Sequence, residues 1–422
     1  MTRTTTTTLA LTACTIAAIA STADAAARTW TRGGADTDWR TAANWMGGNI
    51  AKAGDEAIFN NAVGNPINNA SFSRNHAIGK MTLNVDATTS VDLNGKNFRA
   101  SGLGVPARSV ELKKGSFLFL RDGFFNFQKT INTDDASIII GTDARVLAGS
   151  FLDLLGGDSS LTLNDNAKLT TQGRTEILGD GAAQIDLKGT SRWRSNGNIV
   201  VDGGNNILNP LDFNIGKDAK VTVKPGGATA IFLRGNAVLK NEKNVTGPII
   251  SGLKSDVKNG ARVAPGGRGG GGGLLGAITT DTTSYFAMNG FFTHEAEGSL
   301  DIELAGTAFG ESYDALVVRG GVSLEGGALD VSLLGGFDPS PGDKFTVLRA
   351  TQSISGDFAG LADGSFIQPD NASFPFQVVY HRGSLPGGAS SVVLRAVPAP
   401  STAACLGLAM FPALRRRRPT AG

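Results

Sequence analysis

The sequence predicts an all-β protein: a right-handed parallel β-helix (solenoid), followed by a smaller β region and a short hydrophobic C-terminal helix. Three observations lead to this fold class. The 422 residues include 57 glycines, about twice the usual share, which suits many tight turns. Helix-forming stretches are almost absent, yet 41% of the residues are hydrophobic, and this content argues against a disordered chain. The third observation is an internal repeat.

Four seven-residue segments align, with starts separated by 23, 24 and 28 residues. Each has an aliphatic first residue, a small fifth residue and an apolar seventh residue, and period-two strands run between them. The segments are IGTDARV from Ile140, LNDNAKL from Leu163, LKGTSRW from Leu187 and IGKDAKV from Ile215.

A unit of about two dozen residues suits one turn of a parallel β-helix, in which equivalent positions stack at the strand spacing of about 4.8 Å. We therefore expect about seven rungs over residues 75–245. An antiparallel sandwich with evenly spaced hairpins is the alternative.

Residues 1–27 have the order of a secretory signal peptide. Arg3 precedes an apolar run over residues 9–20, and a small-residue exit follows at Ala23-Asp24-Ala25 or Ala25-Ala26-Ala27. This order of charged, apolar and small residues predicts export.

The two cysteines lie at the ends of the chain. Cys14 is in the leader, where residues 11–14 also fit a lipoprotein cleavage box, so lipidation of Cys14 is an alternative. Cys405 is in the tail. The body between them therefore has no disulfide and depends on burial and backbone hydrogen bonds for its stability.

The body divides at a glycine-rich stretch. We expect a cap and solenoid over residues 28–262, a flexible connector over 263–280 and a second β region over 281–396. Six glycines among residues 267–273 are incompatible with a packed strand, and no GK[ST] follows that would suggest a phosphate loop.

The tail, residues 397–422, combines a short apolar run with a basic cluster. The run over residues 401–414 is too short for a hydrocarbon core of about 30 Å. The arginines at 415–418 favour the cytoplasmic side. The tail therefore predicts a signal handled at a membrane, with transient anchoring.

The charge distribution argues against nucleic-acid binding. The formal net charge is +2, but the four tail arginines contribute +4, so residues 28–396 carry a net charge of −2. Such a body lacks the broad basic field that holds phosphates.

The repeat offers no predicted catalytic, cofactor or metal site. Its turn positions mix acids with other residues, and we expect that no register keeps carboxylates on adjacent rungs for Ca²⁺ or for sugar hydrolysis. We interpret them as solubilising turn formers. The residues at the second position of the three-residue turn are Thr142, Asp165, Gly189 and Lys217. Those at the third position of the turn are Asp143, Asn166, Thr190 and Asp218.

Residues outside the repeat have similar structural interpretations. Asp134 and Asp135 are expected to be surface charges in a turn. The three histidines, His76, His294 and His381, lack the paired spacing of metal ligands. The tryptophans near the N-terminus suit a cap over the end of the solenoid better than a sugar-stacking platform; they are Trp30, Trp39 and Trp45.

The N-terminal body, WTRGGADTDWRTAANWMGGNIAKAGDEAIFNN, resembles the opening of bacterial autotransporter-associated β-strand repeat proteins. The steps at VAPG (263–266) and the segment from Ser312 to Leu348 also resemble that family. The matching opening residues are Trp30, Gly33, Trp39, Asn44, Trp45, Gly54, Asp55, Ala57 and Phe59.

The tail resembles the PEP-CTERM sorting signal, a Pro-containing box followed by an apolar helix and an arginine cluster. Ala399 departs from it, because that family usually has Glu there. The resemblance implies removal of the leader by signal peptidase, transient anchoring, and cleavage near the box by an exosortase-like enzyme. The matching residues are Val397, Pro398, Pro400, Ser401, Thr402, Gly407, Leu408, Arg415, Arg416, Arg417 and Arg418.

These observations predict an exported, non-catalytic structural or adhesive solenoid of the cell envelope, outer surface or extracellular matrix. Its faces would meet polysaccharide or like copies of the chain, and neither a cofactor nor nucleic acid is expected. The alternative is a carbohydrate-active lyase or hydrolase, or a carbohydrate-binding protein, on the same scaffold.

Overall fold

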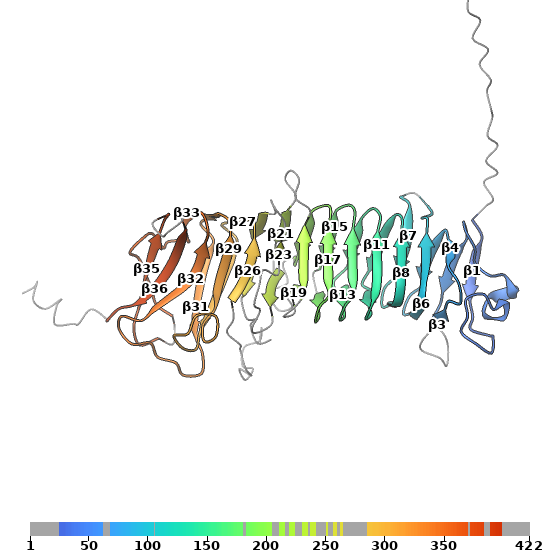
Figure 1. The fold of residues 1–422 in the computed structure, drawn as a ribbon, viewed down its shortest axis with the longest axis horizontal. Coiled ribbons are helices and arrows are strands. Elements are labelled where there is room, and N and C mark those ends of the chain that lie inside the picture. Colours follow the sequence, from blue (N-terminus) through green and yellow to red (C-terminus); the bar gives the residue numbers. More distant parts are fainter. Residues whose placement is uncertain are drawn as a thin grey trace, which may run out of the picture.

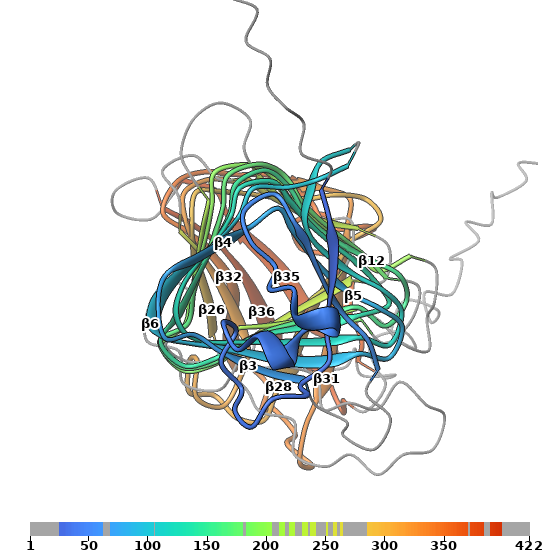
Figure 2. The same cartoon turned by 90° about the vertical axis from the view of Figure 1, so that its right-hand side faces the viewer.

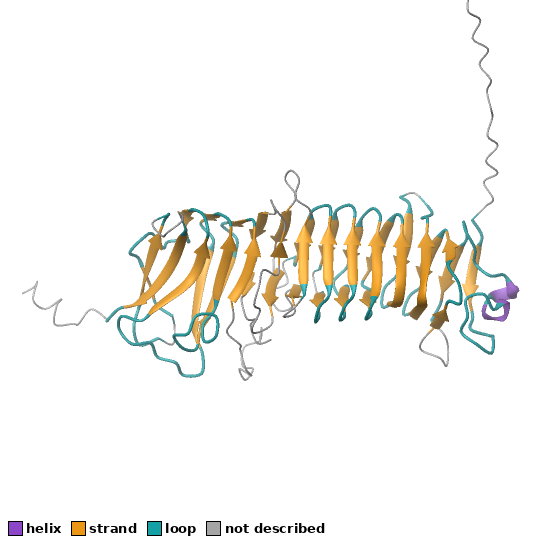
Figure 3. Ribbon diagram, viewed as in Figure 1, coloured by secondary structure: helices purple, strands orange, loops and turns teal. Residues whose placement is uncertain are grey.

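The computed structural model describes residues 25–61, 68–104, 106–179, 183–204, 211–215, 219–223, 230–234, 237–241, 250–251, 256–259, 262–264, 285–369, 372–383 and 389–398. Nearly all regular structure in these ranges is strand (Figure 3). The strands follow one another along a single long axis (Figure 1) and form long parallel sheets, one of them strongly curled. The chain is therefore all-β, with the strand arrangement of a parallel β-solenoid.

The strands form three ladders of parallel strands, because most described strands pair with the third strand after them. The first ladder is a 13-stranded sheet. In spatial order it contains β1 (Ala27–Trp30), β2 (Glu56–Phe59), β5 (Lys80–Leu83), β7 (Arg108–Leu112), β9 (Thr130–Asp134), β12 (Leu152–Leu155), β15 (Thr175–Leu178), β18 (Ile199–Asp202), β21 (Ala230–Arg234), β24 (Asp256–Asn259), β27 (Phe291–His294), β30 (Val322–Glu325) and β33 (Ile354–Asp357).

The other two ladders share two long strands, β6 (Thr88–Ala100) and β8 (Phe117–Phe127), which bend from one face to the next. The second ladder also contains β3 (Asn68–Ser71), β10 (Ser137–Ile140), β13 (Ser160–Leu163), β16 (Gln184–Leu187), β19 (Leu211–Ile215), β22 (Ala237–Asn241), β25 (Arg262–Ala264), β28 (Ser299–Leu304) and β31 (Ala328–Leu333). The third contains β4 (His76–Ile78), β11 (Ala144–Ala148), β14 (Lys168–Thr171), β17 (Arg192–Ser195), β20 (Lys220–Val223), β23 (Ile250–Ser251), β26 (Tyr285–Asn289), β29 (Ala315–Arg319) and β32 (Lys344–Ala350).

The predicted stacking of the repeat is confirmed. Ile140 lies opposite Leu163, Leu163 opposite Leu187, and Leu187 opposite Ile215. These four side chains are at most 1% exposed, so they form one dry column through the core. All strand pairs of this region are parallel, which contradicts the alternative of an antiparallel sandwich. Seven strands of the first ladder, β5 to β21, lie within residues 75–245 in the described part of the chain, in agreement with the expected rungs.

A tight turn joins the second ladder to the third after β10, β13 and β16, whereas β6 and β8 pass through the corner as single strands. The small fifth residue of the repeat donates its N–H to the carbonyl of the second, as in Ala167 to Asn164 at 2.9 Å. Such a turn needs a positive φ at a central position, which Asp143 and Asn166 adopt at 61° and 60° and Gly189 at 51°. The acids and amides of these corners are therefore turn formers, as the sequence predicted.

The tryptophans form a cap over the N-terminal end, where their rings pack on one another. The short 3-10 helices η1 (Ala42–Asn44) and η2 (Met46–Gly48) lie across this end of the ribbon (Figure 2). Trp39 is fully buried, stacks on Phe72 at 4.9 Å between ring centroids, and donates its Nε1–H to the carbonyl of Ala51. Trp45 donates its Nε1–H to the carbonyl of Trp39 at 2.7 Å. Because Trp30, Trp39 and Trp45 are at most 2% exposed, a sugar ring has no access to their faces.

Strand pairing continues across the glycine-rich stretch that we expected to separate two units. β24, β23 and β25 pair with β27, β26 and β28, so all three ladders run on beyond residue 284. Between the described strands, antiparallel pairing begins only near the end, where β34 (Phe366–Ile367), β35 (Phe376–His381) and β36 (Ser390–Ala396) join β32. The C-terminal helix expected over the tail lies outside the described residues.

Candidate functional site

Most of the predicted processing residues lie outside the described ranges. These are Ala23 at the leader exit and Pro400, Ser401, Thr402 and Arg415–Arg418 in the tail, together with the cysteines. At the N-terminus, Ala25 is exposed, whereas Ala27 is the first residue of β1 and pairs with Glu56. At the other end, Val397 donates its N–H to the carbonyl of Pro375 at 3.0 Å, and Pro398 is the last described residue.

Two histidines are held inside the fold by backbone carbonyls. His76 Nε2 lies 2.7 Å from the carbonyl oxygen of Ala51, and His294 Nε2 lies 2.9 Å from that of Ala328. Burial lowers the pKa of both rings, so they are neutral near pH 7. His381 is exposed. Among the described residues, no cluster of His, Cys, Asp or Glu could hold a metal ion.

The acidic pair Asp134-Asp135 is a surface feature with a structural role at one of its members. Asp134 is exposed. Asp135 has a φ of 46°, lies 3.6 Å from the Lys114 ammonium, and accepts the backbone N–H of Asp158 through Oδ1. Its carboxylate therefore stabilises a corner between rungs.

The outer face of the first ladder carries a row of charged and polar side chains. At its N-terminal part, Lys80 forms ion pairs with Glu56 and with Glu111, and Arg108 also pairs with Glu111. Burial alone would raise the pKa of Glu111, but its hydrogen bond with Lys80 and the charges of Lys80 and Arg108 hold that pKa below its usual range. This part of the row is internally neutralised.

Further along the same row, two carboxylates occupy adjacent rungs. Asp153 lies opposite Glu176 in the parallel register, about 4.8 Å away along the ladder. Burial, reinforced by the Glu176 charge, raises the pKa of Asp153. Asp153 Oδ1 is buried without a hydrogen-bond partner in the described structure, whereas Glu176 pairs with Arg174.

This pair corrects the interpretation that no register places acids on neighbouring rungs. That interpretation considered the turn positions, and it missed the strands LDLL and TEIL. The two segments start 23 residues apart. Their second residues, Asp153 and Glu176, both point outward in the alternation of buried and exposed side chains. Alignment of the strands at the same repeat spacing would have placed these two acids on neighbouring rungs.

The third ladder presents the opposite charge. Arg145, Lys168, Arg192 and Lys220 lie opposite one another on the successive strands β11, β14, β17 and β20. All four are exposed. We call this row the basic column; it occupies the sixth position of the repeat, which the sequence interpretation did not use.

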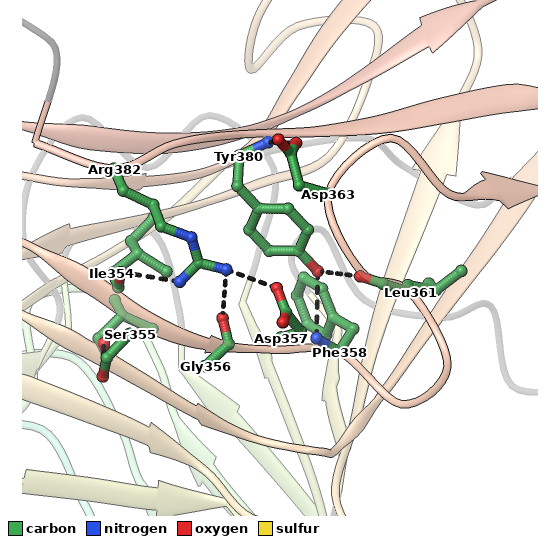
Figure 4. Close-up of polar contacts among 10 residues, drawn as sticks. Ile354, Ser355, Gly356, Asp357, Phe358, Leu361, Asp363, Tyr380 and Arg382 are labelled. Carbon is green, nitrogen blue, oxygen red and sulfur yellow. Dashed lines mark hydrogen bonds and ion pairs between the residues drawn. The ribbon is translucent and has the colours of Figure 1, made fainter.

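A polar cluster closes the C-terminal end over β33 (Figure 4). The guanidinium of Arg382 donates to the carbonyls of Ile354 and Gly356, pairs with Asp357, and lies 4.7 Å from the ring centroid of Tyr380. The Tyr380 hydroxyl donates to the carbonyl of Leu361 at 2.8 Å, and burial raises its pKa to about 12. The cluster thus satisfies the carbonyls of the last strand of the first ladder, a role that blocks further strand addition.

Comparison of the sequence with protein-family models gives no match, and a search of curated proteins gives none. In the part of the chain that the structure describes, no helix has the length and hydropathy of a membrane span. The proposals below therefore depend on the geometry of the described residues and on the sequence patterns.

The acidic pair generates a pH prediction. A carboxyl whose pKa is raised by folding lowers stability as the pH rises from its unfolded value of about 3.9 through its folded value. Replacing Glu176 by Gln should lower the pKa of Asp153 and reduce this loss of stability, by roughly 0.2–1 kcal/mol for one like-charged cross-strand pair. The measurement is an NMR titration of the Asp153 carboxyl, with denaturant unfolding at pH 4 and pH 7.

Arg174→Gln is the matched control. The Arg174 charge lowers the pKa of Asp153, so its removal should move that pKa upward. Shifts of the same sign in both variants would contradict the assigned electrostatics.

Proposed function

We propose that this chain is an exported, non-catalytic structural or adhesive protein of the cell envelope or extracellular matrix. Its body would be a right-handed solenoid, the hand that parallel crossovers almost always take. The leader would direct export through signal peptidase. The tail would act as a PEP-CTERM-like signal that anchors the chain briefly in a membrane until an exosortase-like enzyme cleaves it.

The observation that carries this proposal is the unbroken stack of rungs with a dry core and two closed ends. Inward columns are filled by apolar side chains, as at Ile140 and Leu163. The N-terminal end is covered by tryptophans and the C-terminal end by the Tyr380–Arg382 cluster. This construction supports a stiff rod with long outer faces, which suits a surface or matrix component better than a catalyst.

The proposal predicts the mass of the protein extracted from the envelope. The Ala26 carbonyl accepts the N–H of Glu56 at 2.9 Å, so cleavage after Ala25 leaves β1 complete, whereas cleavage after Ala27 removes this bond. We expect intact-mass spectrometry to show a chain that begins at Ala26 and ends near the Pro-Ser-Thr box. A chain of the full 43.5 kDa recovered from the cytoplasm would contradict the proposal, and an acylated Cys14 terminus would replace signal peptidase cleavage by lipoprotein processing.

A second candidate function has one observation in its favour. Asp153 and Glu176 form a neighbouring carboxyl pair with one pKa raised, and glycoside hydrolases use two carboxyl groups whose environments separate their pKa values. The alternative is therefore a carbohydrate-active enzyme that uses this pair.

Incubation of the purified protein with neutral and acidic polysaccharides distinguishes the two candidates. The structural proposal predicts no new reducing or unsaturated ends, and no difference between the wild type and the Asp153→Asn variant. New ends that disappear in Asp153→Asn, but persist when the turn residue Asp143 is replaced by Asn, would establish the enzyme and overturn the structural assignment.

A further inference from the structure

The basic column is a row of like charges with nothing to neutralise it in the described structure. Its four cations, Arg145, Lys168, Arg192 and Lys220, form no ion pair or hydrogen bond through their side chains with any described residue. At the strand spacing of about 4.8 Å, the column extends for about 14 Å along the long axis of the solenoid.

Such an arrangement has an energetic cost. Like charges directly opposite one another on neighbouring strands destabilise a sheet. The contrast with the first ladder is clear, because there Lys80 is placed between Glu56 and Glu111. The outward row beside the column contains Asn126, Leu147, Thr170, Arg194 and Thr222, which adds a cation and no acid.

The basic surface continues around the corner of the rung. A hollow on the second ladder is lined by Arg121 and Lys188 together with Thr162 and Asn164. Both cations are exposed, and Lys188 begins the turn that leads to Arg192. Two acids lie beside this hollow: Asp122 follows Arg121, and Asp186 is the register partner of Thr162 and accepts hydrogen bonds from Gln184 and Asn214. In the described structure, neither these acids nor the turn residues Asp143 and Asp165 form an ion pair with the column.

An aromatic side chain lies at one end of the column. Phe124 on β8 is the partner of Arg145 in the register and is 36% exposed. Its ring offers an apolar face next to the first cation, which is the combination that holds a charged sugar: a ring to stack on and a cation for the carboxylate.

From these observations we propose that the basic column binds a linear anionic polysaccharide, which lies along the long axis with its carboxylates on successive rungs. This inference rests on the proposed function, since it names the ligand class of a matrix protein. A polyuronate fits better than a nucleic acid for a physical reason. The column is a single row on a body with a net charge of −2, and it lacks the broad basic field that a phosphate backbone requires.

The test measures binding of the full chain to polygalacturonate by isothermal titration calorimetry. The double variant Lys168→Gln/Arg192→Gln removes the two central cations of the column. The matched control, Lys344→Gln/Arg349→Gln, removes one lysine and one arginine that are exposed on β32. We expect about a tenfold loss of affinity in the column variant and less than a twofold loss in the control, since each exposed charge pair contributes modestly.

Two further readouts separate binding from folding. Wild-type affinity should fall as ionic strength rises from about 0.05 to about 0.2 M, because salt screens exposed charges. Polygalacturonate should raise the Tm of the wild type but not that of the column variant. Without ligand, the column variant should melt no lower than the wild type, since it has lost like-charge repulsion.

Three results would overturn the inference: equal losses in the two variants, no binding by the wild type, or tighter binding to single-stranded DNA than to polygalacturonate at equal charge concentration. The intact-mass measurement remains independent of these results. A correctly trimmed protein that ignores polyuronate would remove the ligand assignment alone, whereas an untrimmed cytoplasmic chain would remove the proposed function.

Discussion

The structure depends on one constraint: each rung of the parallel stack must place its side chains directly against those of the rungs before and after it. Equivalent residues of consecutive rungs lie opposite one another, about 4.8 Å apart. Burial therefore acts on whole columns. Ile140, Leu163, Leu187 and Ile215 form one column, and a member that became polar would remove apolar contact from the rungs on both of its sides.

This constraint explains how much of the fold the sequence could predict. The inward columns recur at 23 to 28 residues, so the parallel stack and its rungs are visible in the spacing alone. The corners are visible for the same reason, because in the described turns one central residue has a positive φ, which favours Asp, Asn or Gly there, as at Asp143, Asn166 and Gly189. The cap is predictable from three closely spaced tryptophans at the start of the body.

Two features were beyond the sequence interpretation. Residues 263–280 suggest a boundary by their composition, yet the strands on either side pair in all three ladders. The composition of a loop does not determine whether the strands before and after it pair with each other. The outward columns were missed because exposed positions accept side chains of different size and charge, so they show no clear repeat in the sequence. Net charge also conceals them, since a sum over residues 28–396 gives −2 and shows neither the four cations of the basic column nor the acidic pair Asp153–Glu176 as a cluster.

The central claim is that positions one repeat apart are neighbours, and pyrene labels at Thr170 and Arg194 test it most directly. These positions are register partners on β14 and β17. In a chain with Cys14 and Cys405 replaced by Ser, the Thr170→Cys/Arg194→Cys pair should give strong excimer emission after labelling. The pair Thr162→Cys/Arg194→Cys, on different ladders, should give monomer emission only. Excimer emission from the second pair and not the first would contradict the stacked column on which this account depends.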